Sequence, residues 1–280
     1  MGERVVAYQP GRAFPAVSMT GSRCELQCDH CRGHYLGGMT DASRPGSLPE
    51  VGAVLKKAGA VGILLSGGCD RQGKLPVLDR IDEIRAVRDL GLRVNLHTGL
   101  LGDEDAKRLV GAGADCYSVD IVQDRTAIRD VLHLKVGPEA YRETLAALFS
   151  ARAGRVVPHI CVGLRGDDVE GEMASVDLVR GVPVAALVLL WRLPAPGAPM
   201  RMMKNASPDS FLRVVRHALE ALDRPVLLGC MRPRGMVELE VEAVRLGVAG
   251  MASPAAETLR RLELEGYEVV RSGLCCALHE

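Results

Sequence analysis

The amino-acid sequence predicts an α/β protein of the (β/α)8 barrel class. Short apolar, β-branched segments alternate with segments of helical periodicity almost from end to end, which is typical of βα units repeated around a parallel sheet. A length of 280 residues suits one large barrel, and aromatic residues make up only 3%, so aliphatic side chains must fill the core. A partial barrel is the alternative, because the first and the eighth predicted strands have the weakest patterns.

Eight strands and eight helices are expected. The strands are Ala16–Thr20, Gly62–Ser66, Arg93–His97, Cys116–Ile121, Val156–Gly163, Ala185–Leu193, Val226–Cys230 and Gly247–Met251. The helices are Val51–Ala58, Val77–Leu90, Asp103–Gly111, Glu139–Arg152, Asp168–Val179, Asp209–Leu222, Val237–Leu246 and Pro254–Leu264. The sixth helix has the clearest beginning, since Ser207 can cap it, Pro208 suits its first position and Asp209 favours the positive end of its dipole.

No internal domain boundary is expected. Residues 1–264 would form the barrel, and residues 265–280 would form a tail that folds back and closes over the barrel mouth. The Pro-rich segment Pro194–Ser207 is interpreted as a loop after the sixth strand. The active site of such a barrel lies at the carboxyl ends of its strands.

Composition limits the partners. Lys plus Arg and Asp plus Glu each number 35, so no overall field attracts nucleic acid or an anionic membrane. No apolar run approaches the roughly 18 residues of a membrane span, and the first residues lack an apolar signal segment. We therefore expect a cytoplasmic protein. In that compartment nine cysteines indicate metal or redox chemistry rather than disulfides.

Three cysteines carry the main functional signal. Cys24, Cys28 and Cys31 have the spacing CxxxCxxC directly after the first predicted strand. Three thiolates in one loop can hold a [4Fe–4S] cluster and leave its fourth iron free for a substrate. The alternative is a structural zinc site, although zinc usually takes four ligands from paired CxxC arms.

This spacing resembles that of the radical SAM superfamily. The resemblance implies that S-adenosylmethionine (SAM) chelates the free iron and is cleaved reductively to a 5′-deoxyadenosyl radical. It also implies SAM-binding roles at the ends of later strands and in the cysteine loop. The candidates are Ser66, Gly67 and Gly68 for the amine, Ser118 and Asp120 for the ribose, Gly163 for the adenine, and His30 where an aromatic residue is common. Each of these residues also has an ordinary reading as part of a βα turn or a solvated loop.

Within the superfamily the chain is similar to the biotin synthase and lipoyl synthase group over nearly the whole barrel. The similarity includes Ala-Pro-Gly-Ala-Pro-Met after the sixth strand and Gly-Cys-Met-Arg-Pro-Arg-Gly after the seventh. Biotin synthase holds a second, [2Fe–2S] cluster with three cysteines and an arginine. The matching positions here are Leu64, Asn95, Val157 and Leu227, none of which can serve, so we do not expect biotin synthase activity.

Other cysteines are candidates for an auxiliary iron–sulfur cluster at the barrel mouth. Cys69 follows the second strand, Cys230 ends the seventh, and Cys275 and Cys276 lie near the C-terminus. Because adjacent cysteines seldom both bind one cluster, we expect either Cys275 or Cys276 to be a ligand, but not both. The alternative is that they are buried as small apolar side chains, the reading we prefer for other cysteines within strands, Cys116 and Cys161.

The stretches Cys31–Met39 and Ser66–Gly73 and the terminal Cys-Cys-Ala-Leu resemble the two-component lipoyl synthases of archaea and some bacteria. That resemblance implies insertion of sulfur into a protein-bound octanoyl chain. The partners would be an octanoylated lipoyl carrier protein or domain, a second radical SAM protein and a low-potential electron donor. Arg192, Arg232 and Arg234 are candidates to orient the SAM carboxylate or an acidic carrier, or else are plain surface charges.

Two other functions remain open. One is a radical SAM rearrangement or C–C bond formation in cofactor or amino-acid biosynthesis, without sulfur insertion. The other is a non-catalytic iron–sulfur or zinc-binding protein.

Overall fold

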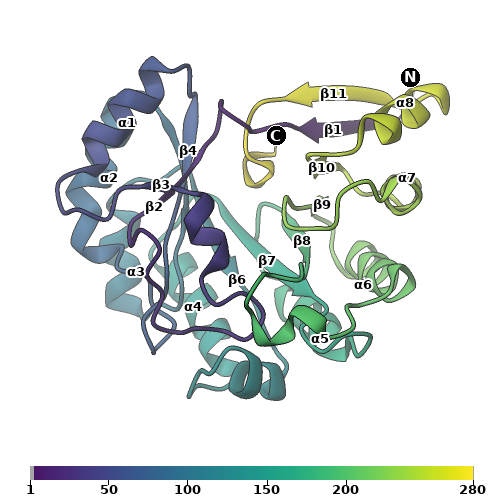
Figure 1. Ribbon diagram of the computed structural model, residues 1–280, viewed down its shortest axis with the longest axis horizontal. Helices are drawn as coiled ribbons and strands as arrows, with labels where there is room; N and C mark the ends of the chain where they lie inside the picture. Colours follow the sequence, from purple (N-terminus) through teal and green to yellow (C-terminus); the bar gives the residue numbers. More distant parts are fainter. Residues whose placement is uncertain (1–2, 280) are drawn as a thin grey trace.

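The computed structural model describes residues 3–279 and contains one sheet of eleven parallel strands, with helices around its outside (Figure 1). Neighbouring strands follow the order β11-β1-β10-β9-β8-β7-β6-β5-β4-β2-β3. Within residues 3–279 the end strands β11 and β3 do not pair with each other, so the sheet is a curled half-barrel. The predicted α/β barrel class is therefore confirmed, in its partial form.

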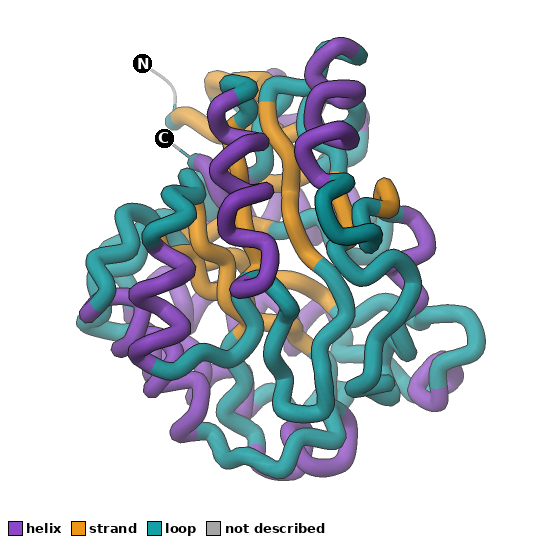
Figure 2. The backbone as a smooth tube through the Cα atoms, turned by 90° about the vertical axis from the view of Figure 1, so that its left-hand side faces the viewer, coloured by secondary structure: helices purple, strands orange, loops and turns teal. Residues whose placement is uncertain are grey.

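The elements follow one another along the chain in the expected order. The strands are β1 (Arg4–Tyr8), β2 (Ala16–Ser18), β3 (Thr40–Asp41), β4 (Gly62–Ser66), β5 (Arg93–His97), β6 (Cys116–Asp120), β7 (Val156–Val162), β8 (Leu187–Trp191), β9 (Val226–Leu228), β10 (Gly250–Ala252) and β11 (Glu268–Ser272). The helices are α1 (Leu48–Lys57), α2 (Ile81–Asp89), α3 (Asp103–Val110), α4 (Glu139–Ser150), α5 (Glu170–Val179), α6 (Pro208–Ala221), α7 (Val237–Leu246) and α8 (Ala256–Leu264). Figure 2, seen from the side of α1 and α2, shows helices in front of the strands.

Every predicted strand and helix is present, and three further strands were missed. β1 lies in the N-terminal segment, β3 has two residues, and β11 lies in the predicted tail. β1 is a buried apolar run paired with β10 and β11, but no helix follows it, so a search for βα repeats passes over it. The beginning of α6 is as predicted, because the Ser207 hydroxyl accepts a hydrogen bond of 3.2 Å from the Ser210 amide.

The C-terminal segment does not lie where we expected it. After β11 pairs with β1, the chain enters the inside of the half-barrel, where Cys276, Ala277 and Leu278 are buried. The Ala277 carbonyl accepts a hydrogen bond from the Cys116 thiol, 3.5 Å away at the beginning of β6. The Arg155 side chain, just before β7, donates to the His279 carbonyl at 2.9 Å. The segment thus fills the interior toward the amino ends of the strands, because its apolar side chains are stabilised by burial there.

Within residues 3–279 no helix has the length and apolar character needed to cross a membrane.

One buried ion pair joins the last βα units. Arg232 and Glu240 lie 2.6 Å apart, with side chains 0% and 1% exposed. The Arg232 guanidinium also donates to the carbonyls of Gly229 and Ala252, and the Glu240 carboxylate accepts from the Ala255 amide at 3.0 Å. The pair therefore ties the loop after β9 to α7 and to the chain after β10. Loss of one partner would leave a charge buried without compensation.

We expect Glu240→Gln to lower the free energy of unfolding by about 3 kcal/mol, because it leaves the Arg232 charge unpaired. The measurement is urea unfolding of the cluster-free protein. Glu238→Gln on the same helix is the matched control, since Glu238 is 85% exposed and its ion pair with Arg261 contributes little. Equal stability of the two variants would contradict a structural role for the buried pair.

Candidate active site

The three motif cysteines lie in a loop that the neighbouring chain holds in place. This loop, residues 19–33, follows β2. The amides of Glu25 and Leu26 both donate to the Cys69 carbonyl, at 2.9 and 3.3 Å, and the Asp29 amide donates to the Val131 carbonyl at 2.8 Å. The loop is therefore fixed to the segments that follow β4 and β6.

Gly68 permits this loop to pack against the end of β4. A Cβ atom at Gly68 would lie 2.1 Å from the Arg23 carbonyl oxygen and 2.5 Å from the Cys24 Cα atom, so only glycine fits. The Gly68 amide donates to the Thr20 hydroxyl at 2.7 Å. We expected the double glycine to let the backbone approach a ligand. In the structure the group that lies close to Gly68 is the backbone of the cysteine loop, at Arg23 and Cys24.

A cavity of about 280 Å³ opens at the carboxyl ends of the strands. Cys24, Cys28 and Cys31 all line it. Most of the other lining side chains are apolar and come from several loops; examples are Leu26, Leu36, Leu100, Leu132, Leu134 and Leu164. One cavity therefore combines three thiols with mostly apolar walls.

The thiols influence one another strongly. A hydrogen bond with the Cys28 thiol lowers the pKa of Cys31 to about 4, assisted by His30. The same hydrogen bond, together with burial and the nearby Cys31, Cys24 and Cys69 thiols, raises the pKa of Cys28. Three thiolates are hard to accommodate together without a cation, and iron supplies the positive charge that such a donor set lacks.

A buried imidazole nitrogen in the cysteine loop also lacks a partner that a bound cofactor could supply. The Nδ1 atom of His30 is buried and has no hydrogen-bond partner among the described residues, although His30 lines the cavity. Buried polar atoms normally find partners. Within residues 3–279, no three His, Cys, Asp or Glu side chains are grouped as ligands of one metal ion. Thiolates of an iron–sulfur cube bind different irons, so the three cysteines and the orphaned imidazole atom fit a cluster with its ligand.

Five of the seven predicted SAM-binding residues line the cavity, and two do not. His30, Ser66, Gly67, Gly68 and Asp120 are in its wall. Ser118 is buried one layer below and donates to the Asn95 side chain at 2.8 Å. Gly163 does not line the cavity, although Cys161 and Leu164 on either side of it do. Its amide donates a hydrogen bond to the Glu172 carboxylate at 2.9 Å. Their roles toward SAM stay predictions.

The three candidate arginines have different positions. Arg192 is 1% exposed and donates to backbone carbonyls of Gly163, Met200, Met203 and Lys204, so it holds the loop after β8. Arg232 is equally buried in its pair with Glu240. The alternative of plain surface charges is wrong for these two residues. Their terminal guanidinium nitrogens donate inside the protein, whereas the Arg232 Nε atom is buried without a hydrogen-bond partner among the described residues. Arg234 is exposed and donates to the Ser253 carbonyl at 3.2 Å.

The four cysteines proposed for an auxiliary cluster divide into two sets. Cys69 lines the main cavity beside the motif cysteines, and its carbonyl accepts from the Cys24 thiol at 3.8 Å. Cys230, Cys275 and Cys276 form the other set, close enough for their charges to shift one another's pKa. Cys275 lies inside the half-barrel, 3.4 Å from the Asn95 side-chain nitrogen. The expectation that all four meet at the barrel mouth is therefore wrong, because the C-terminal segment runs into the interior.

Two histidines in the cavity wall were missed. His97 ends β5, and His159 lies on β7 directly beside Asp120 in the register of the sheet. The alternation of side chains along a strand could have identified His159, because it is two residues from Cys161 and shares its face. Both imidazoles have a lowered pKa, first because of burial, and that of His159 falls to about 4.

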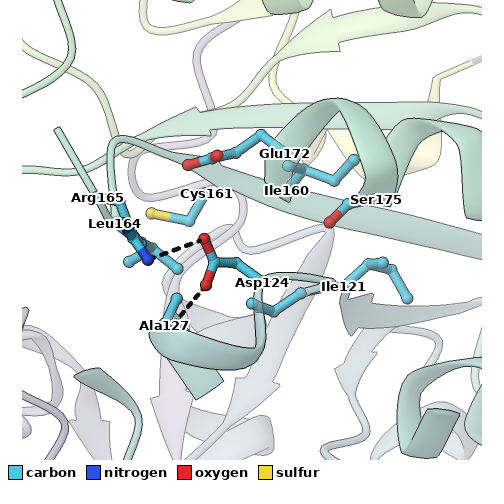
Figure 3. A pocket seen from close by; sticks show the side chains of 10 residues that line it. Ile121, Asp124, Ala127, Ile160, Cys161, Leu164, Arg165, Glu172 and Ser175 are labelled. Carbon is cyan, nitrogen blue, oxygen red and sulfur yellow. Dashed lines mark hydrogen bonds and ion pairs between the residues drawn. The ribbon is translucent and has the colours of Figure 1, made fainter. Parts of the chain in front are cut away.

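A much smaller cavity of about 10 Å³ lies behind this wall. Figure 3 shows Cys161 and Glu172 above Asp124, which accepts a hydrogen bond from the Ala127 amide and faces Arg165. Glu172 is 7% exposed and accepts from the Gly163 amide. Burial raises the pKa of its carboxyl to about 7. Glu172 thus anchors the turn after β7.

Comparison with known proteins shows which proteins this chain is similar to. No family model matches the chain. It is 25% identical over 249 residues to a biotin synthase of Sorangium cellulosum (strain So ce56), covering 82% of this chain and 64% of that protein. It is also 25% identical over 214 residues to a biotin synthase of Marinobacter nauticus, covering 71% and 57%. The chain is therefore similar in sequence to biotin synthases over most of its length.

Solved structures show a similar fold in other proteins. A methylornithine synthase (PylB) superposes with a TM-score of 0.64 and 16% identity, covering 96% of this chain and 84% of that chain. HydG, a maturase of the [FeFe]-hydrogenase, superposes with a TM-score of 0.67 and 17% identity, covering 98% and 66%. The chain spans less than two thirds of the length of the two biotin synthases.

We expect Glu172→Gln to remove a pH dependence of stability from this protein. A carboxyl group whose pKa rises from 4.5 to about 7 on folding stabilises the protein below pH 4.5, and that contribution is lost as the pH rises through 7. Between about pH 5.5 and pH 8 the wild type should lose about 2 kcal/mol relative to the variant. Urea unfolding of the cluster-free protein at both pH values measures this. Glu170→Gln, an exposed change on the same helix, is the control; a parallel pH dependence in wild type and Glu172→Gln would refute it.

Proposed function

We propose that this chain is an enzyme that cleaves SAM reductively and uses the resulting 5′-deoxyadenosyl radical to abstract hydrogen from a substrate. The observation that carries the proposal is that Cys24, Cys28 and Cys31 line one cavity at the carboxyl ends of the strands, together with Ser66, Gly67, Gly68 and Asp120. A [4Fe–4S] cluster on these thiolates would supply the electron that breaks the S–C5′ bond.

The surrounding residues have distinct tasks in this proposal. Gly68 and Thr20 fix the cysteine loop against β4, so the thiols keep their places. Asp120 lines the cavity, and its carboxylate has no hydrogen-bond partner among the described residues, so this carboxylate is free to accept from ribose hydroxyls. Apolar side chains such as Leu100, Leu132 and Leu164 exclude water, which keeps a reactive radical from side reactions.

The first test is production of 5′-deoxyadenosine. After anaerobic reconstitution with iron and sulfide and reduction with dithionite, the wild type should release 5′-deoxyadenosine from SAM. The triple variant Cys24, Cys28, Cys31→Ala should release none, because it lacks the thiolates of the motif. Cys116→Ala is the matched control, since that buried thiol does not line the cavity. No product from the wild type would refute the proposed chemistry in favour of a non-catalytic metal protein.

We infer a more specific reaction as a second candidate: insertion of sulfur into a protein-bound octanoyl chain, as one half of a lipoyl synthase. The observation that favours it is the set Cys230, Cys275 and Cys276, which lies beside the barrel interior and could hold an auxiliary cluster that donates sulfide. The mostly apolar cavity wall also suits an alkyl chain. An octanoylated lipoyl carrier, a second radical SAM protein and a low-potential electron donor are the partners this reaction needs.

Iron retained by the triple variant separates this candidate from a rearrangement or C–C bond formation. If Cys230, Cys275 and Cys276 hold a cluster, the triple variant should keep part of its iron and sulfide, visible by Mössbauer spectroscopy. Adding Cys230→Ala and Cys275→Ala should remove that remainder. A triple variant without iron would contradict sulfur insertion and leave a rearrangement or C–C bond formation as the reaction.

A further inference from the structure

His159 of β7, which lines the same cavity as the motif cysteines, has a side-chain nitrogen without a hydrogen-bond partner among the described residues. His159 is 6% exposed, and its Nδ1 atom lies 3.0 Å from the Val157 carbonyl oxygen. A carbonyl can only accept, so Nδ1 carries the proton of this hydrogen bond. The Nε2 atom has no hydrogen-bond partner within residues 3–279, and the residue lines the cavity.

The surroundings keep this imidazole neutral. Burial lowers the pKa of His159, and the neighbouring His97 ring, with its centroid 5.5 Å away, opposes a second positive charge. Asp120, its partner across the strand pair, acts in the opposite direction, but to a smaller extent. In a neutral imidazole with the proton on Nδ1, the other nitrogen presents a lone pair. The wall of the cavity therefore offers an acceptor at His159.

His97 reinforces this arrangement. Its Nδ1 atom lies 3.4 Å from the Ser66 hydroxyl, so the ring is oriented by the end of β4. The carboxylate of Asp120, next to His159, adds further acceptor atoms and a negative charge. The protein supplies no partner for His159 Nε2 among the described residues, and a ligand in the cavity with a donor group would supply one.

We propose that His159 Nε2 binds a hydrogen-bond donor of the substrate, an amine or a hydroxyl, and so positions the adjacent carbon for hydrogen abstraction. This inference rests on the proposed radical chemistry and gives its substrate class. It makes His159 a binding residue for a polar substrate, and so favours a rearrangement or C–C bond formation over the second candidate, because the end of an octanoyl chain has no donor group.

The tautomer can be measured without any cofactor. In cluster-free protein labelled with ¹⁵N at histidine, the ring resonances of His159, assigned with His159→Gln, should report a protonated Nδ1 and an unprotonated Nε2 at neutral pH. A proton on Nε2 in that state would overturn the proposal, because the acceptor would not exist.

Ligand probes test the donor requirement in the same sample. Hexylamine and 1-hexanol should shift the His159 Nε2 resonance, whereas hexyl methyl ether, which has the same chain but no donor, should not. His159→Phe should weaken binding of both donors by about tenfold and leave the ether unaffected, while His159→Gln, which restores an acceptor, should recover part of the loss. His217→Gln is the control, since His217 is paired with Asp177 away from the cavity.

The outcomes separate this inference from the proposed function. Equal binding of donors and ether, or no effect of His159→Phe, would overturn the donor site while production of 5′-deoxyadenosine stands. Donor-selective binding to a protein that never releases 5′-deoxyadenosine would overturn its role in radical chemistry.

Discussion

The close approach of the cysteine loop to Gly68 is the constraint on which the rest of the site depends. With a Cβ atom 2.1 Å from the Arg23 carbonyl oxygen, any other residue at the end of β4 would push the loop away. The amides of Glu25 and Leu26 donate to the Cys69 carbonyl, and these hydrogen bonds also hold the cysteine loop against the segment after β4. The three thiols therefore take their positions from the sheet rather than from a flexible loop. Sites supported in this way are positioned more accurately than sites on free loops.

The interior of the half-barrel is filled from an unexpected direction. Cys276, Ala277 and Leu278 pack with Val157 and Leu227, and Cys275 contacts Asn95. Val157, Leu227 and Asn95 are three of the four positions that the sequence resemblance matched to the second cluster of biotin synthase, and the fourth, Leu64, packs against the same group. The C-terminal segment thus occupies the space around positions whose residues cannot bind metal. Any auxiliary cluster in this chain must use other residues, and Cys230 with Cys275 and Cys276 is the set nearest that space.

Local sequence patterns predicted much of this structure because βα units bury regular stripes of apolar residues. β4 and β5 have the predicted bounds, as does α7. β1 and β11 were missed because no helix connects them as a repeat, and their pairing at the edge is decided by tertiary contacts. The cysteine spacing predicted three residues of one cavity, since short spacing in one loop limits their separation. The separation of Cys69 from the set of Cys230, Cys275 and Cys276 could not be predicted, because it depends on where the C-terminal segment packs.

The central claim is that SAM binds at an iron that Cys24, Cys28 and Cys31 leave without a protein ligand. The most direct measurement is electron–nuclear double resonance on the reduced, reconstituted protein with SAM labelled by ¹⁷O in the carboxylate and ¹⁵N in the amine. The account predicts strong coupling of both nuclei to the cluster, as expected of direct ligands. Absence of coupling from a protein with a full complement of iron would contradict it, since SAM would then not be bound to the cluster.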